Sequence, residues 1–72
     1  MATYNGHKNW NFWNVSLWVA NDEPLYRRAR ALKAVHGSKG AALRLMMELP
    51  THTPDGAPFS ISSLTAAVRQ LE

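Results

Sequence analysis

The 72-residue sequence has no cysteine, so it forms no disulfide and offers no thiolate ligands for a structural zinc ion. It has no apolar run near the roughly 20 residues that a membrane-spanning helix needs, and its first residues lack the apolar core of a signal peptide. Acidic residues are few, with five Asp and Glu against eight Lys and Arg, which gives a formal charge of +3. These absences predict one small domain over residues 1–72 that works in a reducing cytoplasm and contacts no membrane.

The remaining residues predict a mainly α fold, a compact bundle of three to four short helices. Asn9 and Ser60 are good N-caps, Gly37 suits the closure of a helix, and Pro50 cannot continue one. The expected elements are a flexible tail at 1–9, a helix at 10–20, a second that begins within 21–24 and stops at Gly37, a third from Ser38 to the residue before Pro50, an irregular loop at 50–59, and a last helix from Ser60 to Leu71.

Two places also suit β-structure. The run Phe12-Trp13-Asn14-Val15 combines aromatic and β-branched residues that fit a strand as well as a helix. The run Thr53-Pro54-Asp55-Gly56 is typical of a β-turn, with proline second and glycine fourth, which tightens either a short hairpin or a plain loop.

Apolar spacing predicts the buried faces. Trp10, Trp13, Asn14 and Leu17 recur at helical spacing and define the expected core face of the first helix, which Phe12, Val15, Trp18 and Val19 widen. We expect Trp13 and Leu17 to anchor this face in the core. The third helix is apolar nearly all round, so we expect it to be the central element. The expected apolar stripe of the second helix consists of Leu25, Ala29, Leu32 and His36. The expected apolar stripe of the last helix consists of Ile61, Leu64, Val68 and Leu71.

Charge is the clearest functional signal. Six of the eight basic residues follow one another between Pro24 and Met47 with no acid among them. The cations of the second helix lie opposite its apolar stripe, so they should face solvent and suit phosphates or an acidic protein surface. The alternative is an ordinary solvated surface, with Glu23 paired to Arg27.

Aromatic residues add to this signal, because a domain this small cannot fully bury three tryptophans. Trp18 falls away from Trp13 on the helical wheel, so it belongs either to the core or to an exposed rim, where tryptophan beside arginine is typical of a protein interface. The candidate partner-binding residues are Trp18, Tyr26, Arg27, Arg28, Arg30, Lys33, Lys39 and Arg44.

Two nucleic-acid motifs are incomplete. Gly37-Ser38-Lys39-Gly40 matches the G-x-x-G of KH domains, but the strands of a KH sheet are not predicted beside it. The two helices that meet at Gly37 resemble a helix-turn-helix, but the second offers mostly apolar residues that we expect in the core, where base edges require polar groups.

Catalytic and metal-binding motifs are missing as well. His7, His36 and His52 lack the short spacing of zinc ligands. His52 and Asp55 are near enough in sequence to touch across the turn, but no nucleophile or orienting group accompanies them. We therefore expect no enzyme activity, no metal and no cofactor.

Residues 10–26, W-N-F-W-N-V-S-L-W-V-A-N-D-E-P-L-Y, resemble the signature W-x-[YF]-W-N-V-x-L-W-x-x-N-D-x-x-L-Y of a family of small proteins from bacteriophages and other mobile elements. The later T-P-D-G at 53–56 is similar to one that recurs near the end of such proteins. Pro24 stands where members carry glycine or another residue, which suits a helix start. The resemblance carries no assigned activity, but it implies a bacterial host cell and binding to a host machine.

The leading hypothesis is a stoichiometric inhibitor of a host defence complex such as a CRISPR effector. Many such inhibitors are acidic DNA mimics, whereas this chain is basic, so the charge favours an acidic protein surface, or the nucleic acid within a ribonucleoprotein complex, as the partner. The alternatives are a nucleic-acid-binding accessory protein and a self-associating structural protein whose tryptophans are covered in a homodimer.

Overall fold

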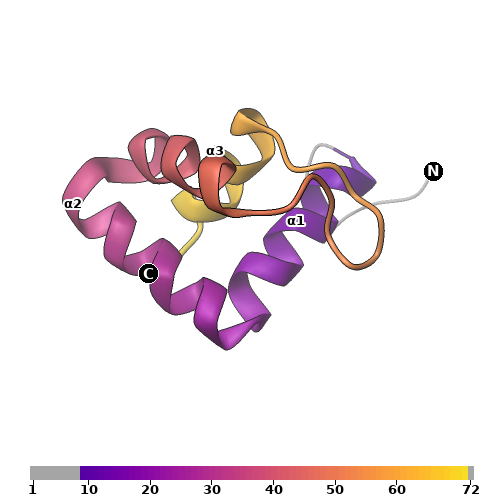
Figure 1. Cartoon of the computed structure of the whole chain (residues 1–72), viewed down its shortest axis with the longest axis horizontal. Coiled ribbons are helices and arrows are strands. Elements are labelled where there is room, and N and C mark those ends of the chain that lie inside the picture. The colour runs from indigo at the N-terminus through magenta and orange to yellow at the C-terminus, as the bar shows by residue number, and fades with distance from the viewer. Residues whose placement is uncertain (1–8, 72) are drawn as a thin grey trace.

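The computed structural model describes residues 9–71, which form three helices: α1 (Trp10–Asn21), α2 (Glu23–Glu48) and α3 (Ile61–Arg69) (Figure 1). No strand occurs in this range, where an isolated antiparallel bridge joins His52 and Pro58 across the loop. The predicted mainly α bundle is confirmed, and the strand alternative at 12–15 is wrong, because those residues belong to α1. The tail predicted at 1–9 lies, except for Asn9, outside the described residues.

Side-chain caps start all three helices. The Asn9 side chain accepts a hydrogen bond from the backbone N–H of Phe12 at 3.1 Å, and the Asp22 carboxylate accepts one from Leu25 at 3.2 Å. Ser60 and Ser63 form a reciprocal capping box, with 3.0 Å bonds in both directions. These caps satisfy N–H groups that have no partner inside the helix, which confirms the helix starts expected at Asn9, Asp22 and Ser60.

α2 consists of two helical segments that meet at a kink at Gly37. The Gly37 backbone is not helical, with φ 76° and ψ 176°, a combination that only glycine adopts readily, so the boundary predicted there is confirmed and the second and third predicted helices are the two halves of α2. Gly40 is needed beside the kink, because a Cβ added there would lie 2.7 Å from the Cβ of His36. Figure 1 shows the chain turning back at this point, and α2 packs against α3.

The core lies around α3, which packs against both α1 and α2 (Figure 1). The prediction that residues 38–49 form the central element is therefore wrong. The second half of α2 buries only one side, and Leu43, Met46 and Met47 are exposed, with Met47 at 88%. The buried apolar residues are Val15, Val19, Ala29, Leu32, Ala41, Ala42, Leu45, Ala57, Leu64, Ala67, Val68 and Leu71.

The core face of α1 is only partly the predicted one. Asn14, Val15 and Val19 are buried as expected, whereas Trp10 is 38% exposed, Leu17 is 37% exposed, and Trp13 is half-buried, so the expected anchor is wrong. The reason is that α1 is apolar on both sides, so its composition does not select the side that α3 covers. The expected stripes hold in part, since Leu64, Val68 and Leu71 are buried while His36 and Ile61 are exposed.

Candidate functional site

A polar network fastens the 50–60 loop to α1. The buried Asn14 amide donates to an Asp55 oxygen at 2.9 Å, and its carbonyl accepts from the buried hydroxyl of Thr53. The Trp18 indole N–H donates to the same Asp55 oxygen at 3.0 Å. Inside the loop, the Gly56 N–H donates to the Thr53 carbonyl at 2.9 Å, which confirms the predicted turn.

This network gives structural roles to Trp18 and Asp55, whose roles the sequence alone did not determine. The hydrogen bonds from Asn14 and then Trp18 lower the pKa of Asp55, because both stabilise its charged form. Trp18 is half-buried, and its N–H is engaged within the chain. In the described chain, His52 and Asp55, which are near enough in sequence to touch, form no hydrogen bond or ion pair with each other, and the Nδ1 of His52 lies 2.9 Å from the Thr51 hydroxyl.

Residues 10–26 and the T-P-D-G turn at 53–56 meet in this network. Asn14 and Trp18 come from the first segment, and Thr53 and Asp55 come from the turn about 40 residues later. Their side chains hold the loop in place, so these four residues have a structural role.

Two of the predicted basic residues are paired within the chain. Arg27 lies 2.7 Å from Glu23, as the i, i+4 spacing predicts. Arg28 forms a two-pronged contact with Glu48 on the other half of α2, at 3.1 Å and 2.7 Å. This contact raises the pKa of Arg28 and lowers that of Glu48, chiefly through the hydrogen bonds between them. Arg28 therefore bridges the kink, a role that its sequence neighbours do not reveal.

Lys33 is engaged at the end of α3. Its half-buried side chain donates from Nζ to the carbonyls of Leu71 and, at 3.3 Å, Arg69. These carbonyls lie where a helix end leaves acceptors unpaired, and a cation is favoured there. The prediction that Lys33 belongs to a solvent-facing basic surface is therefore wrong, because its ammonium group serves the fold.

The remaining cations face outward. The Arg30 guanidinium lies 5.6 Å from the centre of the Tyr26 ring and donates to the Tyr26 hydroxyl at 3.3 Å. Arg44 and Lys39 are exposed on the second half of α2, beyond the kink. The structure thus keeps Arg27, Arg30, Lys39 and Arg44 at the surface, divided between the two halves of one helix. We call these four residues and Tyr26 the basic surface.

A second candidate surface runs along the outer side of α1. Trp10, Trp13, Leu17 and Ala20 follow one another at spacings of three, four and three residues, and none of the twelve residues of α1 is charged. Trp10, Leu17 and Ala20 are exposed and Trp13 is half-buried. We call these four residues the α1 stripe.

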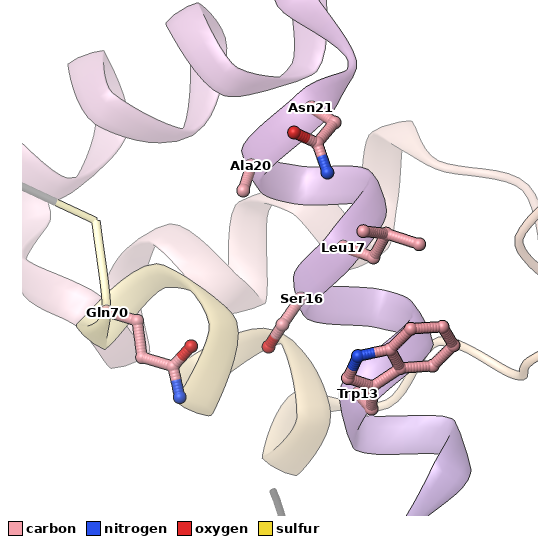
Figure 2. Close-up of a pocket in the computed structure, with 6 residues that line it drawn as sticks. All are labelled: Trp13, Ser16, Leu17, Ala20, Asn21 and Gln70. Atoms are coloured by element: carbon pink, nitrogen blue, oxygen red, sulfur yellow. The ribbon is translucent and has the colours of Figure 1, made fainter. Parts of the chain in front are cut away.

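Two hollows flank Leu17. One, of about 200 Å³, is lined by Trp13, Ser16, Leu17, Ala20, Asn21 and Gln70. The other, of about 190 Å³, is lined by Leu17, Trp18 and Asn21. Figure 2 shows the Ser16 hydroxyl turned toward the segment that carries Gln70. This hydroxyl is buried and has no hydrogen-bond partner in the described chain.

The other predicted site types gain no support from the described residues. Within 9–71, no three His, Asp or Glu side chains gather as metal ligands, and His7 lies outside this range. The G-x-x-G lies inside the kinked helix α2. The second half of α2, the would-be recognition helix, was expected in the core but buries only one side. Its outer side carries exposed Leu43 and Met47, so it still offers few polar groups to base edges. None of the described helices is long and apolar enough to cross a bilayer.

Fold and surface together define a small three-helix protein with a basic surface on α2 and an uncharged apolar stripe on α1. The model of a family of unknown function, DUF7249, matches residues 1–67, so the chain belongs to this family. Neither the curated proteins nor the solved structures gave a match.

Proposed function

We propose that this protein is a non-enzymatic binding protein of a bacteriophage or another mobile element, and that it engages an acidic surface of a host protein or ribonucleoprotein complex. A bacterial defence complex, such as a CRISPR effector, is the class of target that the resemblance of residues 10–26 favours. Binding inside the host cytoplasm fits the same context.

The proposal rests on one observation, namely that the described acidic side chains are engaged within the chain whereas several basic side chains are not. The four acidic residues between 9 and 71 all serve the fold: Asp22 caps α2, Glu23 and Glu48 pair with arginines, and Asp55 anchors the loop. In contrast, Arg30, Lys39 and Arg44 are exposed and have no carboxylate partner within that range. The surface therefore displays positive charge that the carboxylates of residues 9–71 leave uncompensated.

Such a surface is suited to an acidic partner. Exposed cations steer a partner of opposite charge and raise the rate of encounter, by about 10- to 1000-fold in favourable cases. Contact with the Tyr26 ring limits the freedom of the Arg30 side chain before binding, and arginine and tyrosine are both enriched among residues that dominate binding energy. Arg27 also remains available, because its exposed pair with Glu23 is weak and exchanges readily.

The test is affinity capture of the tagged protein from a bacterial lysate treated with nuclease, with bound proteins read by mass spectrometry. The parent chain should retain a defined protein complex, and Arg30→Glu should lose it. The matched control is Arg69→Glu, which makes the same charge change at an exposed arginine on α3 and should bind like the parent. Lys33 is left unchanged, because its reversal would disturb the end of α3.

Two outcomes contradict the proposal. If Arg30→Glu stays folded and captures the same complex as the parent, the basic surface is not the contact. If capture disappears with nuclease, and the pure protein binds free DNA or RNA with an affinity that falls steeply with salt, the protein is instead a nucleic-acid-binding accessory protein.

A further inference from the structure

We propose that the α1 stripe is the interface of a homodimer, in which α1 packs antiparallel against α1 of a second copy. This inference concerns a different surface from the basic surface on α2. Its failure would leave the proposed function in place, and the reverse also holds.

The α1 stripe is an apolar surface of the kind that a binding partner covers. The side of a surface helix that faces solvent is normally polar, whereas here it carries two tryptophans, a leucine and an alanine. Trp10 and Leu17 are exposed by 38% and 37%, although both belong to residue types that proteins usually bury.

The absence of charge favours a second copy as the occupant. With no charged residue in α1, the stripe offers nothing to attract the acidic partner expected at the basic surface. Two copies of this chain, each with a formal charge of +3, repel when basic regions meet. They meet with least repulsion through an uncharged side, which α1 provides.

The shape of the surface is self-complementary. A two-fold interface uses the same patch on both partners, so the patch must contain both a protrusion and a place to receive it. Leu17 stands between hollows of about 200 Å³ and 190 Å³, so protrusion and hollows lie side by side. The spacing of three, four and three residues along the stripe is the one that packs helix side chains between those of a facing helix.

The order of residue sizes favours an antiparallel arrangement. Antiparallel packing places the large Trp10 opposite the small Ala20 of the second copy, and Trp13 opposite Leu17. Parallel packing would place Trp10 against Trp10 and the small Ala20 against Ala20, which crowds one end of the interface and leaves a gap at the other. Antiparallel helices also bring opposite dipole ends together.

The available area predicts a weak dimer. A typical interface covers about a tenth of a small protein's surface, which is about 460 Å² of the 4594 Å² of this chain. The twelve residues of α1 extend over about 18 Å, so the stripe and its hollows supply an interface at the lower end of the known range. Dimerisation should therefore depend on concentration.

The test is the solution mass of the whole chain, measured by sedimentation equilibrium from about 5 μM to 1 mM. The weight-average mass should rise from 8.1 kDa toward twice that value across the series. Leu17→Glu should remain at the monomer mass throughout, and so should Ala20→Glu, a change at an exposed position that leaves the core intact. The matched control is Met47→Glu, which adds the same charge at an exposed apolar residue of α2 and should dimerise like the parent.

Circular dichroism of each variant establishes that it is folded. A parent chain that stays monomeric at 1 mM would overturn the proposal and leave the stripe to a foreign partner. A dimer that survives both Leu17→Glu and Ala20→Glu, or one that Met47→Glu abolishes, would also overturn it, because the contact would then lie elsewhere.

Discussion

Replacing Asn14 with alanine should strongly destabilise the protein, because this one side chain joins α1 to the loop through two hydrogen bonds. Asn14 is 1% exposed, and Asn14→Ala leaves the buried Thr53 hydroxyl without its acceptor. An unsatisfied buried polar group costs about 1–3 kcal/mol. A 72-residue domain has a total stability of about 4–11 kcal/mol, so this loss is a large share of it.

Thermal unfolding followed by circular dichroism measures the effect. A loss of about 2 kcal/mol should lower Tm by about 10–15 °C in a domain of this size. The control is Asn21→Ala, the same substitution at an exposed residue of the same helix, where we expect a change within about 0.5 kcal/mol. Equal Tm values for the two variants would show that the loop does not depend on Asn14, and would refute the reasoning.

Three further predictions concern the same fold. The pKa of Asp55 is lower in the folded protein than its ordinary value of 3.8, so the carboxylate contributes its full stability at pH values above 3.8. This contribution is lost as the pH falls through the lower folded pKa. The Tm of the parent chain should therefore drop in acid, and the Tm of Asp55→Asn should drop less. Lys33→Met should cost about 1–2 kcal/mol by urea denaturation, because the carbonyls at the end of α3 lose a charged donor, whereas Arg30→Met should cost much less; equal losses would contradict this role. Gly37→Ala should cost about 1–3 kcal/mol in the same assay, since its φ of 76° strains any side chain, and an unchanged midpoint would show that α2 straightens without penalty.

Features set by neighbouring residues were predictable from the sequence. The caps at Asn9 and Ser60 depend on residues three positions away, and so does the Gly56 turn. Gly37 was expected at a helix boundary, and the backbone is not helical at this residue. The next helical segment follows directly as the second half of α2.

Features set by distant partners were not predictable. Arg28 meets Glu48 across 20 residues, and Lys33 meets Leu71 across 38, so neither pairing leaves a local pattern. The orientation of α1 was predicted only in part for a related reason. Its apolar residues surround the helix, and only the position of α3 decides that Val15 is buried while Leu17 is exposed.

The commitment of all four described acids to the fold has a consequence for how this sequence varies over evolution. Loss of Asp22, Glu48 or Asp55 removes a cap, the ion pair across the kink or the loop anchor, so selection for folding alone should retain a suitable acceptor there, and least strictly at Glu23, whose pair is exposed and weak. Within residues 9–71, Arg30, Lys39 and Arg44 have no carboxylate partner. In an alignment of relatives, conserved acidic positions together with variable basic positions would indicate selection for the fold alone. Basic positions conserved as strictly as the acidic ones would indicate selection for binding a shared partner.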